Sequence, residues 1–241
     1  MLNSDTKNDA AKHAVLMAAL VMATIFVPWL PGLFGFSDAT YVQLYWYDMA
    51  LMSCTVLVAL SYRPFRQVIW KVLHLRNNGD HPPQIFWMQQ ILIIVMALAV
   101  FKIFFPLISD PFHEWFPPPP FTNYGDISIW FFLGEILLAY VLGAIEEEFT
   151  FRIVIRNAVE RFTSSRVALY LISILIFGLA HWQKGVSSMV YAMLTGAVLM
   201  YLYVRSGSII PSIVAHYLSN AIWLKRWTAW RDRPTRPRRP Y

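Results

Sequence analysis

The sequence contains little charge and almost no cysteine. Only 14% of its 241 residues are charged, against 57% that are hydrophobic, and Cys54 is the single cysteine. A lone cysteine excludes an intramolecular disulfide and a thiolate metal cluster. The low charge excludes an ordinary soluble domain, in which about a quarter of the residues are charged. The composition therefore indicates a protein that is surrounded in part by lipid and not by water alone.

Long apolar runs are what the sequence has instead. A membrane-spanning helix needs roughly 20 predominantly apolar residues, and candidate runs lie at about 14–35, 41–62, 85–108, 128–148, 167–182, 187–204 and 208–224. These runs predict an all-α, polytopic transmembrane helical bundle of seven or eight spans, and hence a multi-pass integral membrane protein. The first run is too long for a cleavable signal peptide, and no cleavage site of small residues follows it.

The basic residues indicate orientation in the bilayer rather than nucleic-acid binding. The net charge is +6, and cytoplasmic loops of membrane proteins carry an excess of Lys and Arg. This rule places the N-terminus, the loop 63–84 and the segment 152–166 in the cytoplasm. Seven crossings would leave the basic, proline-rich tail 225–241 on the opposite side, so the side of the tail stays open. The expected partners are the lipid bilayer and a membrane-associated substrate, with no nucleic acid.

Ionisable residues inside the predicted spans are the functional candidates, because such residues are costly in a membrane unless they are paired or hydrated. The stretch "GAIEEEFTFR" places Glu146, Glu147 and Glu148 at the end of an apolar run. Arg152 lies one turn after Glu148 on the same helix face and can neutralise it. Glu147 is rotated by about 100° from Glu148 and lacks such a cation, which suits a general base. Glu146 and Glu135 are expected to be peripheral to the site.

Helix geometry predicts that two histidines reach Glu147. Its helix is expected to continue well past the glutamates to a turn at 163–165, from which the next helix returns. At a rise of 1.5 Å per residue, Glu147 and His181 both lie roughly 22–25 Å from that turn. His216 enters from a third helix, with Asn220 one turn after it. One carboxylate, two imidazoles and an amide are therefore expected to converge within the membrane.

Three short motifs occur in order on these predicted spans. They are EExxxR (Glu147, Glu148, Arg152), FxxxH (Phe177, His181) and HxxxN (His216, Asn220). Together they resemble the CAAX protease and bacteriocin-processing family of intramembrane proteases, also called the Abi family. The segment "RSGSIIPSIVAH" resembles the stretch before the last histidine of that family. One departure is Ile153, at a position where the family often has glycine.

The resemblance implies how the chain is divided and what it does. A catalytic transmembrane core would occupy 128–224, the last four spans. About three N-terminal spans in 1–127 would precede it, and the tail 225–241 would follow it. The implied activity is endoproteolysis near the C-terminus of a membrane-associated, prenylated or tagged protein or peptide. The implied location is the inner membrane of a bacterium.

The resemblance also implies a role for each motif residue. Glu147 would activate the attacking water, and His181 would assist it or bind the water. His216 and Asn220 would stabilise the oxyanion, as donors aimed at developing charge do. Glu148 and Arg152 would be supporting partners that hold Glu147 in place.

Two alternatives remain at this stage. Glu147, His181 and His216 could form a zinc site with an open position, but the HExxH spacing of zinc peptidases is absent. A metal-independent mechanism without a cofactor is therefore favoured, with zinc as the alternative. The alternative function is a non-catalytic immunity or scaffold protein on the same fold, or a carrier that uses the carboxylates as a proton relay.

Overall fold

The computed structural model describes residues 83–116, 129–160, 162–182 and 185–231, together with single positions between 49 and 73. Every regular element in these ranges is a helix, which confirms the all-α prediction for this part of the chain. In chain order the elements are α5 (Pro83–Trp115), α6 (Ile129–Gly134), η2 (Glu135–Ala139), α7 (Tyr140–Glu148), η3 (Phe149–Ile155), α8 (Arg156–Val159), α9 (Arg166–Leu179), α10 (Val186–Ser206) and α11 (Ile210–Arg231).

The glutamates lie on one long helical stretch. α6, η2, α7, η3 and α8 follow one another without a break, and η2 and η3 are π-helical. Such segments have i to i+5 hydrogen bonds and are frequent at functional sites; η3 begins directly after Glu148. After α8 the chain turns, and the Oγ of Ser165 caps α9 by accepting the N–H of Ala168 at 3.3 Å. The predicted long helix and the predicted turn are therefore both present.

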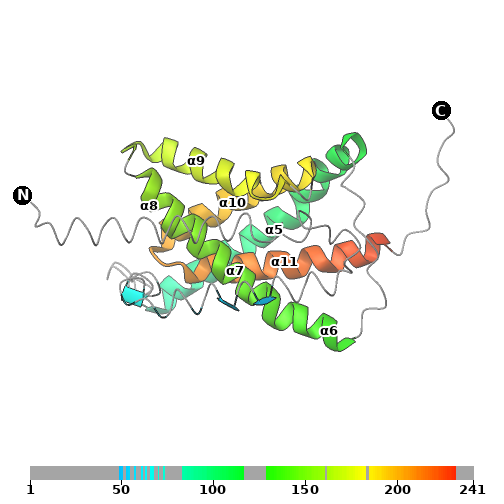
Figure 1. Ribbon diagram of the computed structural model, residues 1–241, viewed down its shortest axis with the longest axis horizontal. Helices are drawn as coiled ribbons and strands as arrows, with labels where there is room; N and C mark the ends of the chain where they lie inside the picture. Colours follow the sequence, from blue (N-terminus) through cyan, green and yellow to red (C-terminus); the bar gives the residue numbers. More distant parts are fainter. Residues whose placement is uncertain are drawn as a thin grey trace, which may run out of the picture.

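The remaining helices pack around this stretch. α9 packs against α10, α10 against α5 and α11, and α11 against both α5 and α7; Figure 1 shows α7 and α11 crossing in the middle of the bundle. One core cluster joins α5, α10 and α11 through Ala97, Phe101, Leu199, Leu202 and Ala215. α10 ends at Gly207, whose φ of 65° is left-handed, a conformation that costs other residues roughly 1–2 kcal/mol. This turn lets α11 return along the bundle.

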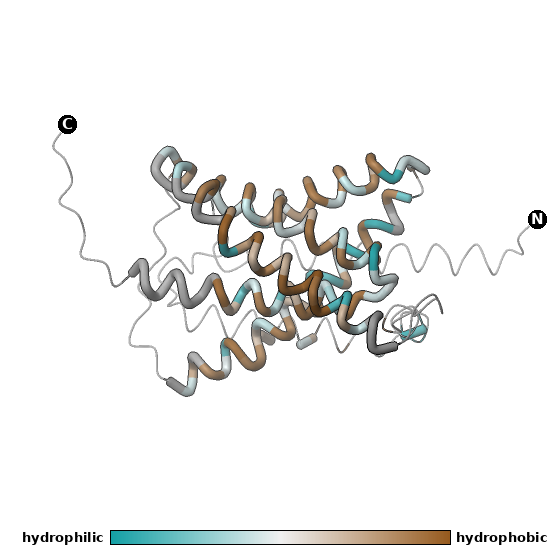
Figure 2. The backbone as a smooth tube through the Cα atoms, turned by 180° about the vertical axis from the view of Figure 1, so that it is seen from behind, coloured by the Kyte–Doolittle hydropathy of each residue, from teal (hydrophilic) through white to brown (hydrophobic). Residues whose placement is uncertain are grey.

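Two of the described helices are long and apolar enough to cross a membrane. They are the Trp87–Phe104 part of α5 and the Val186–Ser206 helix, and the apolar helix Arg166–Leu179 is shorter. Figure 2 shows hydrophobic residues along most of the helical tube. The predicted runs at 14–35 and 41–62 lie wholly or mostly outside the described residues, so the number of spans stays a prediction. α11 continues to Arg231, into the segment predicted as a tail.

Candidate active site

Glu148 is the centre of a buried ion-pair network. Arg152 lies one turn later in η3, and its Nε contacts Glu148 Oε2 at 2.9 Å while its Nη2 donates to Oε1 at 3.3 Å. Both side chains have an exposure of 0%. His216 of α11 adds a third contact, from its Nδ1 to Glu148 Oε1 at 2.9 Å. The pairing of Glu148 with Arg152 follows the predicted spacing, whereas the contact with His216 was not predicted.

Glu147 faces both histidines with the same oxygen atom. Its Oε2 lies 3.8 Å from the Nε2 of His181 and 3.7 Å from the Nε2 of His216. That oxygen is buried and accepts no hydrogen bond from the described part of the chain, although 27% of the side chain as a whole is exposed. These separations exceed a hydrogen bond. The two neighbouring glutamates therefore differ in kind, because Glu148 is fully satisfied and Glu147 has one buried oxygen without a donor.

The Nδ1 atom of each imidazole makes a hydrogen bond with a partner of its own. His181 lies in the turn just after α9, and its Nδ1 contacts the carbonyl oxygen of Phe177 at 2.9 Å. A carbonyl only accepts, so Nδ1 carries the proton there. His216 Nδ1 likewise donates to the carboxylate of Glu148. In the neutral state, both Nε2 atoms therefore present a lone pair to the space beside Glu147.

The other predicted residues lie on the same helical stretches as this centre. Asn220 is half-buried one turn after His216, and it hydrogen-bonds none of the residues that the structure describes. Glu146 is also half-buried, on α7. Glu135 is buried and its Oε1 receives the hydroxyl of Tyr140 at 3.5 Å. The cluster that the structure brings together is therefore Glu147, Glu148, Arg152, His181 and His216.

The zinc alternative would use three donor atoms around Glu147. Among the described residues, no group of three or more His, Cys, Asp and Glu side chains is placed so that it could hold a metal ion. Both Nε2 atoms and Glu147 Oε2 would be the donors of the zinc alternative. The choice between the metal-independent mechanism and the zinc alternative therefore stays a prediction.

Comparison with known proteins places this site in a family. The family model described as type II CAAX prenyl endopeptidase, Rce1-like, matches residues 129–222. Residues 129–222 belong to the CAAX protease family. No curated protein and no solved structure matches the chain. The matched segment contains the whole cluster around Glu147, and the class of activity is that of a CAAX-type intramembrane endopeptidase. The family and the apolar helices together indicate that the chain is an integral membrane protein.

Phe177 of the FxxxH motif, for which no role was predicted, packs against three residues of this site. Its ring lies 5.0 Å from the Arg152 guanidinium carbon, 5.0 Å from the His181 ring and 6.0 Å from the His216 ring. A Cβ at Gly196 of α10 would lie 2.8 Å from the Phe177 ring, so this glycine makes room for it. Aromatic and cation–π contacts of this kind add to the area that the ring buries. Its position in the FxxxH motif was the signal that could have revealed this role.

Proposed function

We propose that the chain is an endopeptidase in which Glu147 activates a water molecule for attack on a peptide bond inside the membrane. The observation that carries this proposal is the buried Glu147 Oε2 without a hydrogen-bond donor, faced by two imidazole nitrogens at 3.7 and 3.8 Å. A water molecule at roughly 2.8 Å from Oε2 would also lie within about 2.8 Å of an imidazole nitrogen at those separations. Because Oε2 itself is buried, this water would have to enter from the exposed part of the Glu147 side chain, between Glu147, His181 and His216.

The proposed step moves a single proton. The water oxygen attacks the scissile carbonyl carbon while Glu147 Oε2 accepts one of its protons. The carbon–nitrogen bond then breaks, and the same proton passes from Glu147 to the departing nitrogen. His181 orients the water by accepting its second hydrogen at Nε2, because its Nδ1 is committed to the Phe177 carbonyl. No metal takes part in this sequence.

The oxyanion formed in this step needs hydrogen-bond donors. Asn220 lies one turn beyond His216 on α11, and its side-chain amide is a donor. His216 offers a lone pair at Nε2 while it is neutral, and it becomes a donor only when that nitrogen carries a proton. Glu148 fixes the ring through Nδ1, as an orienting carboxylate does for a catalytic histidine. The pair Glu148–Arg152 thus supports His216 as well as the neighbouring Glu147.

The substrate class that we propose is a membrane-associated protein or peptide cut near its C-terminus. The matched family is described as a prenyl endopeptidase, which favours a prenylated or otherwise tagged end. A carboxylate site within apolar helices is reached most directly by a substrate that already lies in the bilayer. We place the chain, as a multi-pass protein, in a bacterial inner membrane.

Two neighbouring glutamates allow a matched test of the general base. The purified full chain in detergent is given a prenylated C-terminal peptide, and cleavage is followed for the wild type, Glu147→Gln and Glu146→Gln. Loss of a general base lowers the rate by about 10²–10⁴-fold, so Glu147→Gln should fall by that factor. Glu146→Gln, the same change one residue earlier, should stay within a few-fold of the wild type. Cleavage that survives Glu147→Gln would contradict the assignment.

A chelator separates the metal-independent mechanism from the zinc alternative. The same peptide assay is run after incubation with phenanthroline, and then after zinc is added back. The proposal expects unchanged cleavage throughout. Loss with phenanthroline and recovery with zinc would show that the mechanism depends on a metal. Absence of cleavage of every prenylated and unprenylated peptide by the wild type would favour the scaffold or carrier alternative.

A further inference from the structure

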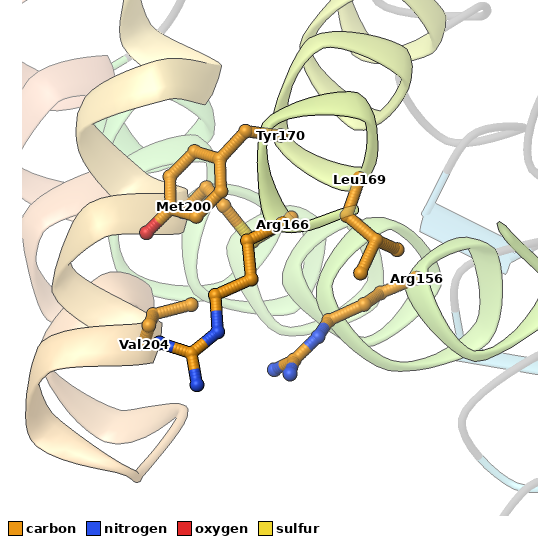
Figure 3. A pocket seen from close by; sticks show the side chains of 6 residues that line it. All are labelled: Arg156, Arg166, Leu169, Tyr170, Met200 and Val204. Atoms are coloured by element: carbon orange, nitrogen blue, oxygen red, sulfur yellow. The ribbon is translucent and has the colours of Figure 1, made fainter. Parts of the chain in front are cut away.

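A cavity lies at the opposite end of α9 from the active site. It has a volume of about 250 Å³ and is lined by Arg156, Arg166, Leu169, Tyr170, Met200 and Val204. Figure 3 shows these six side chains around the cavity. The first residue of α9 lines it, whereas His181 lies just past the last, so roughly 20 Å of helix separates the two places. The cavity is therefore distinct from the site around Glu147.

Two arginines from different helices give this cavity a positive charge. Arg156 comes from α8 and Arg166 from α9, and Figure 3 shows their guanidinium groups turned toward the same part of the cavity. Arg156 is paired with Glu160 at 2.9 Å. Arg166 is exposed and makes no ion pair with any residue in the described ranges. Two guanidinium groups with one carboxylate leave a net positive charge, to which the N-terminal end of the α9 dipole adds.

Apolar side chains form most of the rest of the lining, together with Tyr170, and exposed apolar residues lie nearby. Leu169, Met200 and Val204 form the apolar part of the cavity, and Val204 is 46% exposed. At the same end of the bundle, Phe162 is 89% exposed and Val167 is 69% exposed. Exposed aromatic and apolar side chains beside arginines are typical of a helix end at the membrane interface. A ligand here would meet positive charge and apolar surface together.

We propose that this cavity binds the headgroup of an anionic phospholipid. The guanidinium groups of Arg156 and Arg166 donate hydrogen bonds to the phosphate, for which arginine's planar fork is well suited. The start of an acyl chain lies against Leu169 and Val204. An anion between the two arginines also relieves their mutual repulsion. The binding is independent of the peptide cleavage proposed above.

Native mass spectrometry of the detergent-purified full chain tests this site. The chain is titrated with phosphatidylglycerol, with phosphatidylcholine and with inorganic phosphate, and bound molecules are counted for the wild type and for Arg166→Gln. The wild type should retain phosphatidylglycerol in preference to the other two. One charge-assisted hydrogen bond is worth about a tenfold change in affinity, so Arg166→Gln should weaken phosphatidylglycerol binding by about tenfold. Its peptide cleavage should stay unchanged.

Arg205 provides a charge-matched control. It is exposed on the last turn of α10, next to Val204, and does not line the cavity. Arg205→Gln removes the same charge and should change phosphatidylglycerol binding by less than about twofold. An equal loss in Arg166→Gln and Arg205→Gln would show unspecific attraction to basic surface and overturn the proposal. Binding of inorganic phosphate as tight as that of phosphatidylglycerol would overturn the lipid assignment.

Discussion

Two ion pairs with the same contact distance allow the effect of burial on the free energy of unfolding to be compared within this bundle. Arg152 Nε contacts Glu148 at 2.9 Å, and Arg156 Nε contacts Glu160 at 2.9 Å, each over one helical turn. The first pair has an exposure of 0% on both sides, whereas Arg156 is 31% exposed and Glu160 39%. The Nε contact is the same in both pairs, so the differences are the burial of the first pair and the further contacts of Glu148 with Arg152 Nη2 and His216.

Replacement of each glutamate by glutamine should therefore have unequal effects. Glu148→Gln leaves the guanidinium of Arg152 buried without a countercharge, and the loss of one partner from a buried pair costs about 3–5 kcal/mol. Arg152 Nη1 already lacks an acceptor among the described residues, and none of these residues offers a second partner. Glu160→Gln removes an exposed helical pair, which is worth about 0.3–0.5 kcal/mol. We expect a difference of about 3 kcal/mol or more between the two variants.

Unfolding of the full chain in mixed micelles, followed by circular dichroism, measures this difference. Equal losses in Glu148→Gln and Glu160→Gln would refute the reasoning. A second substitution separates the unpaired charge from a general loss of packing. Arg152→Met in the Glu148→Gln background removes the buried charge as well, and it should recover part of the lost stability, because removal of both partners is far less costly than removal of one.

Three further substitutions test the packing around the site by the same unfolding measurement. Phe177→Ala should cost about 3–5 kcal/mol, because the ring is only 1% exposed; a cost below about 1 kcal/mol would contradict its central place. Gly196→Ala should cost about 1–3 kcal/mol, since its Cβ would lie 2.8 Å from that ring; Phe177→Leu in the same chain should reduce the cost. Ser206→Ala should cost about 1–3 kcal/mol, because the buried Ser206 Oγ accepts the N–H of Ser208 at 3.2 Å; an unchanged midpoint would show that this N–H finds another acceptor.

Much of the fold near the site could be predicted because its signals are local. Apolar runs longer than a turn mark the positions of α5, α9, α10 and α11, and the polar stretch at 163–165 marks the turn before α9. The pairing of Glu148 with Arg152 follows from one turn of helix. Helix rise alone places Glu147 and His181 at the same depth, and the structure brings them within 3.8 Å.

The features that could not be predicted depend on distant or subtle contacts. His216 contacts Glu148 across 68 positions of sequence, and no local spacing indicates such a pair. The π-helical segment η3 shifts each backbone hydrogen bond by one residue, for which the sequence "FTFRIVI" has no marker. Phe177 was recognised within a motif, but its contacts with three site residues depend on the packing of α9 against η3 and α11.

The environment of the glutamates explains how the helical bundle tolerates buried carboxylates. All seven residues of η3, Phe149–Ile155, are buried, and seven consecutive residues cover every side of a helix. The segment after Glu148 is therefore enclosed by protein and not by lipid. Charged groups inside membrane proteins face such an interior or a water-filled cavity.

Glu147 and Glu148 should consequently respond in opposite ways to the same substitution. Glu148 accepts three hydrogen bonds, from Arg152 and His216, whereas the buried Oε2 of Glu147 accepts none from the residues that the structure describes. An amide at position 147 can place its NH₂ group where Oε2 lies and donate to an imidazole Nε2, so Glu147→Gln should leave the unfolding free energy unchanged or raise it by about 1 kcal/mol. Cleavage should nevertheless be lost, as is common where activity depends on a poorly stabilised group. If Glu147→Gln destabilised the chain as much as Glu148→Gln, Glu147 would be a structural residue and not the base.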